Sequence, residues 1–91
     1  MMMMWAWSGA SDQLLTLSEV PEGQVVRVVG VRAGLGLTSR LTAMGVVPGT
    51  DILMVNNRGA GPAVVEVRGT RLALGRGMTR RVLVRRLEHV G

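Results

Sequence analysis

The stretch AVVEVRGTRLAL, residues 63–74, decides the fold because it predicts a β-hairpin. Apolar and polar side chains alternate along its first half, which is typical of a half-buried strand, and Glu66 and Arg68 are expected to face outward. Gly69-Thr70 predicts a tight turn, after which the chain returns. The side chains expected to face inward are Ala63, Val65, Val67, Leu72 and Leu74. A hairpin with one apolar face needs further strands to cover that face.

Glycine recurs at the positions where further strands are expected to end. The segments between these glycines are short and rich in Val, Leu and Ile, which is typical of a small β-barrel. Strands are predicted over residues 24–31, 51–57 and 82–87, in addition to the two strands of the hairpin. The segment 24–31 is apolar on both sides, so we expect it to be covered in part on both faces.

One short helix is predicted between the first and second of these strands. Leu37, Leu41 and Met44 are spaced i, i+4, i+7, which places them on one helix face. Gly45 is expected to end the helix in the left-handed conformation. Pro48-Gly49 fits the central positions of a type II turn. The predicted fold is therefore mainly β: a small, partly open, SH3-like barrel of five short strands with one inserted α-helix.

Two short connections carry local signals of their own. Ser18 is expected to cap a single helical turn, with Glu19 and Glu22 near the positive end of that turn. Residues 75–81 are expected to form a short crossover with one 3₁₀ turn around Met78.

The composition excludes several kinds of chemistry. The chain has 91 residues, which is enough for one domain, and contains no Cys, so disulfides and thiolate metal sites are excluded. His89 is the only histidine, and no second His or Cys completes a site around it. The sequence Gly34-x-Gly36 lacks the lysine and the strand–loop–helix context of a phosphate-binding loop. We therefore expect no enzyme activity, no cofactor and no metal site.

The positive charge of the chain is concentrated in its body. The net charge is +5; there is no lysine, and residues 24–91 contain all eleven arginines but only three carboxylates, which gives this part +8. A basic surface suits a nucleic acid or an acidic protein. The alternative is that arginine only supplies the solvated faces of short strands. The exposed aromatic residues and lysine clusters that nucleic-acid binding usually uses are absent.

Residues 1–13 form an arm ahead of the domain, which is assigned to residues 14–91. The arm begins with the apolar run MMMMWAW, which is too short to span a bilayer and lacks the features of a secretory signal. Three interpretations stay open: the arm is disordered, it packs against the domain or a second copy, or it touches a membrane interface. Packing against a second copy predicts a homo-oligomer.

The run from Arg40 to Ile52, RLxxMGVxPGTxI, resembles the signature of the FeoA family. Residues 17–23 are similar to the opening turn of that family, residues 61–74 to its central hairpin and residues 81–84 to its closing strand. The resemblance covers residues 14–87. It implies an SH3-like barrel and an accessory role in bacterial ferrous iron uptake beside FeoB, a permease with a cytoplasmic G-protein-like domain. It also implies a cytoplasmic protein, recruited to the inner face of the membrane by this partner.

The predicted partner-binding residues lie on the helix and the turn after it. They are Leu35, Leu37, Arg40, Leu41, Met44 and Pro48. Leu35 and Leu37 are expected to form an exposed apolar knob, although Leu37, Leu41 and Met44 fit the core better than they fit a docking surface. Arg40 either pairs with an acidic residue of the partner or braces the Pro48-Gly49 turn. The competing functions are an arginine-rich nucleic-acid-binding module and a self-associating module.

Overall fold

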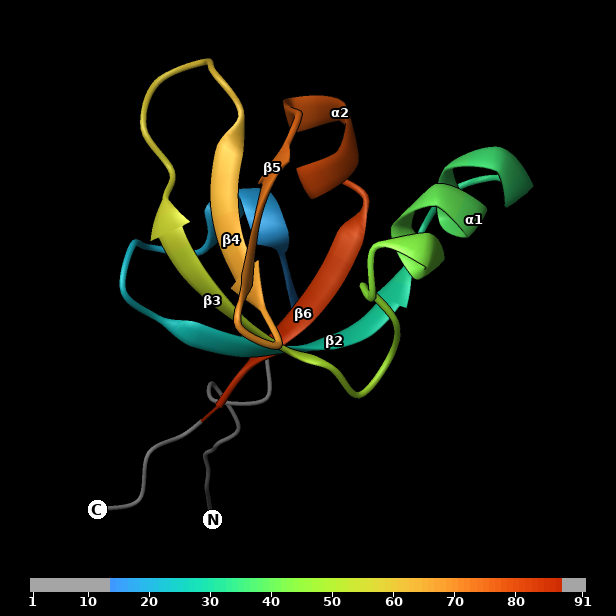
Figure 1. Ribbon diagram of the computed structural model, residues 1–91, viewed down its shortest axis with the longest axis horizontal. Helices are drawn as coiled ribbons and strands as arrows, with labels where there is room; N and C mark the ends of the chain where they lie inside the picture. The colour runs from blue at the N-terminus through green and yellow to red at the C-terminus, as the bar shows by residue number, and fades with distance from the viewer. Residues whose placement is uncertain (1–13, 88–91) are drawn as a thin grey trace, which may run out of the picture.

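Figure 1 shows the computed structural model, which describes residues 14–87. This part of the chain contains six strands, one α-helix of nine residues and two single helical turns. In chain order the elements are β1 (Leu14–Thr16), η2 (Leu17–Glu19), β2 (Val25–Val31), α1 (Leu35–Ala43), β3 (Asp51–Asn56), β4 (Ala63–Val67), β5 (Thr70–Leu74), α2 (Arg76–Thr79) and β6 (Val82–Arg86). The prediction of a mainly β domain with one inserted helix is confirmed.

All six strands form one antiparallel sheet in the order β1-β6-β2-β3-β4-β5. The sheet curls around the core, and β1 and β5 are its two edges, so the barrel is partly open (Figure 1). The predicted number of five strands was wrong because β1 was not foreseen. This strand has only three residues, too few for a period-two pattern, and it exists because Leu15 pairs with Val84 at the other end of the chain.

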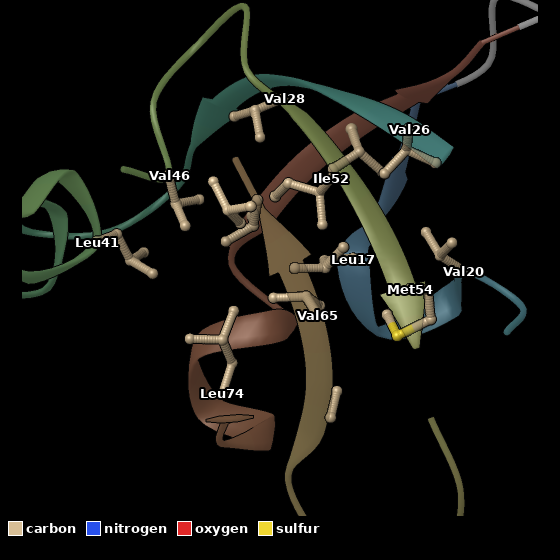
Figure 2. Packing of buried hydrophobic residues seen from close by; sticks show 14 residues of the cluster. Leu17, Val20, Val26, Val28, Leu41, Val46, Ile52, Met54, Val65 and Leu74 are labelled. Carbon is tan, nitrogen blue, oxygen red and sulfur yellow. The ribbon is translucent and has the colours of Figure 1, made fainter. Parts of the chain in front are cut away.

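The core lies inside the curled sheet and is almost entirely aliphatic (Figure 2). Its completely buried side chains include Ile52, Met54 and Val65 from the sheet and Leu41 from the helix. The predicted inward row of β4 is confirmed, and Leu74 of β5 is buried as predicted, while Leu72 of β5 is only half-buried. Fourteen buried hydrophobic residues make up the cluster, so burial of aliphatic surface is the main source of stability.

The two faces of β2 are covered to different extents. Val26 and Val28 point into the core, whereas Val25 is 42% exposed and Val29 is 39% exposed. The outer face is therefore covered only in part, and Arg27 lies on it between the two valines, paired with Asp51.

The turns follow the glycine positions closely, with one shift. Gly45 ends α1 with φ 88°, and Gly49 has φ 91° in a turn that Thr50 closes by donating its N–H to the carbonyl of Val47 at 3.1 Å, as predicted. The β4–β5 turn is centred on Arg68-Gly69 rather than Gly69-Thr70. Both of its central residues have positive φ, at 52° and 81°, which is the backbone of a type I′ hairpin.

The helical turns also differ in detail from the prediction. Thr16, not Ser18, precedes η2, and its N–H donates to Oε1 of Glu19 at 2.8 Å. The crossover contains an α-helical turn rather than a 3₁₀ turn, because Thr79 N–H donates to the carbonyl of Gly75, four residues back, at 3.0 Å.

Candidate functional site

The helix α1 stands beside the barrel on the connection between β2 and β3 (Figure 1). Its only completely buried side chain is Leu41, which points toward Val46 and the core (Figure 2). Leu37 and Met44 are half-buried and pack against the same core. The predicted helix face is therefore the face that attaches α1 to the barrel, and the side chain of Leu41 is not accessible to a partner.

The other side of α1 is open to solvent. Leu35 lies in the first turn of the helix and is 85% exposed, the highest value among the exposed large hydrophobic residues of the described chain. At about 100° per residue, it lies on the side of the helix opposite to the buried row. The two residues of the predicted apolar knob are therefore separated: Leu35 projects into solvent, while Leu37 turns toward the barrel.

Arg40 and Pro48 are both exposed. Arg40 takes part in none of the salt bridges among residues 14–87. The turn that contains Pro48 is held by backbone bonds instead: Gly49 N–H donates to the carbonyl of Val28 at 2.8 Å, and Val28 N–H donates to the carbonyl of Thr50 at 2.9 Å. These bonds hold the turn without a contribution from the guanidinium of Arg40.

Three arginines are neutralised by carboxylates on the barrel surface. The closest pair joins Nε of Arg27 to Oδ1 of Asp51 at 2.8 Å. The hydrogen bond from Arg27 lowers the pKa of Asp51 and raises the pKa of Arg27. In the described chain, seven arginines have neither a salt bridge nor a side-chain hydrogen bond: Arg32, Arg40, Arg68, Arg80, Arg81, Arg85 and Arg86. The surface therefore keeps a positive potential that suits an acidic partner.

A polar network that the sequence did not reveal joins η2, α2 and the loop after β3. Nδ2 of Asn57 donates to the carbonyls of Ser18, at 3.0 Å, and Val20, at 2.8 Å. Oδ1 of Asn57 accepts a hydrogen bond from the guanidinium of Arg76, and the backbone N–H of Asn57 donates to Oε2 of Glu22 at 2.9 Å. The hydrogen bond from the backbone N–H of Asn57 is the main cause that lowers the pKa of Glu22, and the contact with Arg58 lowers this pKa to a smaller extent. The network fixes the start of the loop between β3 and β4.

The described part of the chain contains neither a candidate metal site nor a helix that could cross a membrane. Among residues 14–87, no three side chains of the types His, Cys, Asp and Glu come together as metal ligands would. None of the helices in the same range has the length and apolar character needed to cross a membrane. His89, the only histidine, lies outside the described residues, as do the arm residues 1–13.

The curled six-stranded sheet and the helix between β2 and β3 define a small SH3-like β-domain. Residues 15–86 match the sequence profile of the FeoA domain. The chain belongs to the FeoA domain family.

The relatives agree in both sequence and structure. A curated protein of Methanocaldococcus jannaschii, named as Fe(2+) transport protein A, is 32% identical over 75 residues, covering 82% of this chain and 90% of its own. The crystal structure of an iron uptake regulatory protein, FeoA, is 35% identical with a TM-score of 0.79 and covers 82% of this chain and 100% of its own. A zinc-complexed FeoA of Stenotrophomonas maltophilia, described as a prokaryotic SH3 domain protein, is 35% identical with a TM-score of 0.69, covering 77% of this chain and 88% of its own.

Proposed function

We propose that this chain is a non-enzymatic accessory protein of ferrous iron uptake, which acts in the cytoplasm by binding the cytoplasmic G-protein-like domain of a FeoB-type permease. Membership of the FeoA family supports the role in iron transport, and similar relatives are named for Fe(2+) transport and iron uptake. A binding role rather than a catalytic one agrees with the surface of the described residues, which offers an apolar projection and unpaired arginines.

The observation that carries this proposal is the exposure of Leu35, at 85%, on a helix that is attached to the barrel by a single completely buried side chain. A nine-residue helix is too short to be stable alone in water, so α1 depends on its packing against the barrel, and that packing leaves Leu35 outside the core. Arginine is enriched at the energetically important positions of protein interfaces. Arg40 is exposed on the same helix, about 140° around its axis from Leu35, and no carboxylate of residues 14–87 pairs with it.

Calorimetric titration of the full chain with the purified cytoplasmic domain of FeoB tests the proposal. Leu35→Ala is expected to weaken binding about tenfold, which corresponds to about 1.4 kcal/mol. Arg40→Glu is expected to leave the fold intact and to weaken binding at least as much, because it reverses a charge at the contact. Leu14→Ala and Arg68→Glu are matched controls, since both sites are exposed and lie outside α1, in β1 and in the β4–β5 turn.

Absence of binding by the unmodified chain, together with normal ferrous uptake in a deletion strain, would refute the proposed partner. If Leu35→Ala and Arg40→Glu both leave the affinity unchanged, FeoB is still the partner but α1 is not the contact surface. Unfolding of Arg40→Glu, seen by circular dichroism, would assign Arg40 a structural role instead.

A second candidate function, nucleic-acid binding, is favoured by the seven arginines that have no carboxylate partner in the described chain. Binding of this kind weakens steeply as the salt concentration rises. Fluorescence anisotropy with labelled RNA and DNA at about 50 mM salt tests it, and absence of binding there excludes it.

A further inference from the structure

Three of the four exposed large hydrophobic residues of the described chain lie on one side of the sheet. Leu14 of β1 is 50% exposed, and Val25 and Val29 of β2 are 42% and 39% exposed. The strand register places them together, because Leu14 is opposite Arg85 and Arg85 is opposite Arg27, which lies between the two valines. Residues that face each other across an antiparallel pair project from the same side of the sheet.

The half-buried Leu53 extends this surface, because it is the partner of Val25 on the neighbouring strand β3. We call Leu14, Val25, Val29 and Leu53 the outer β-face. A strand that is apolar on both sides is typical of a sheet covered on both faces. Residues 14–87 leave Val25 and Val29 partly exposed on either side of the Arg27–Asp51 salt bridge, so the outer β-face has room for a further covering group.

The arm formed by residues 1–13 has the composition and the reach to supply this cover. Its first seven residues, MMMMWAW, are all apolar. The chain enters β1 at Leu14, which is itself part of the outer β-face. The distance from β1 to β2 across the sheet is two strand spacings, about 10 Å. The six residues between Trp7 and Leu14 can span about 20 Å when extended, which is enough to reach β2.

We propose that the Met/Trp run of the arm folds back onto the outer β-face of its own chain. Arg85, which lies in the middle of this face, takes part in no salt bridge among the described residues. Its aliphatic stem can pack against the methionines, and its guanidinium suits the face of an indole ring. The only charged residue of the arm is Asp12, which is opposite in sign to Arg85.

The chain offers a direct optical test. Trp5 and Trp7 are its only aromatic residues, so tryptophan fluorescence reports on the arm alone. Acrylamide quenching of the full chain is compared with quenching of a synthetic peptide of residues 1–13. We expect a severalfold lower quenching constant and a blue-shifted emission in the full chain, because indoles packed on the sheet are shielded from water and from the quencher.

Variants of the outer β-face locate the contact. Val25→Arg is expected to raise the quenching constant toward that of the peptide, and the milder Val25→Thr to raise it in part, since Thr keeps the branched shape that suits a strand. Leu35→Arg places the same charge at an exposed site on α1, away from the outer β-face, and is expected to leave the quenching constant unchanged. Far-ultraviolet circular dichroism confirms that each variant is folded.

Each alternative has a distinct result, and none of the measurements involves an iron-transport partner. Equal quenching of the full chain and the peptide would overturn the proposal, as would a folded Val25→Arg variant with unchanged quenching. Protection that disappears on dilution, with a dimer in sedimentation, would assign the arm to a second copy and reject packing within one chain. A blue shift that requires added anionic vesicles would assign the arm to a membrane surface, and would also reject packing of the arm within one chain.

Discussion

Replacing Leu41 by alanine removes the only side chain of α1 that is completely buried. Three carbon atoms leave the core, which at about 0.8 kcal/mol each lowers the free energy of unfolding by about 2.4 kcal/mol. The cavity left behind adds to this, so we expect a total loss of about 2–5 kcal/mol. The whole domain is expected to be stable by about 5–14 kcal/mol, so the loss is a large share of the total.

Urea and thermal unfolding followed by circular dichroism measure this loss. For a domain of this size each kcal/mol corresponds to about 4–8 °C in Tm, so Leu41→Ala is expected to melt at least about 10 °C below the unmodified chain. Leu35→Ala is the matched control, because it makes the same chemical change in the same helix at a side chain that is 85% exposed. It is expected to alter stability by less than about 0.5 kcal/mol.

The comparison of the two alanine variants decides whether α1 is part of the cooperative domain. Equal effects of the two variants would contradict the burial argument. A loss below about 1 kcal/mol for Leu41→Ala would mean that the helix detaches while the barrel stays folded, because global unfolding then no longer reports the lost contact.

Two further predictions concern polar groups on the barrel. Asn57→Ala leaves Nη1 of Arg76 and two backbone carbonyls without the amide that they bind, and is expected to lower the free energy of unfolding by about 1–3 kcal/mol, measured in urea; a neutral effect would show that water replaces the amide. In the folded protein the pKa values of Asp51 and Glu22 lie below the usual values of 3.8 and 4.5. The two ionised carboxylates therefore stabilise the fold fully at any pH above the usual values, and this stabilisation is lost as the pH falls through the lower pKa values of the folded state. The urea midpoint should therefore be flat from neutral pH to about pH 5 and decline below it, with a shallower decline in Asp51→Asn, whereas a midpoint that rises on acidification would contradict the assignment.

The features that could be predicted from the sequence are those encoded by a few neighbouring residues. The alternation in residues 63–74 predicted the hairpin and its inward row, because side chains of a strand alternate between the two faces of a sheet. Gly45 and Gly49 predicted their turns, since positive φ strongly favours glycine. In the candidate site, the exposure of Leu35 was predicted, while the use of this surface by a partner is still a prediction.

The features that could not be predicted depend on contacts between distant parts of the chain. The strand β1 forms because Leu15 meets Val84, and nothing within three residues signals a partner so far along the sequence. The bond between Asn57 and Arg76 is likewise set by how the loop after β3 meets α2.

Local periodicity by itself determined which residues are apolar on each side of a strand or helix, and hence a small β-barrel with one helix. Only the tertiary structure decided which of those apolar sides became core. Val26 is buried whereas Val25 is 42% exposed, although the two are neighbouring valines of the same strand. The physical reason is that burial depends on what packs against a residue, and in this domain the packing partners come from strands that are far apart in the sequence.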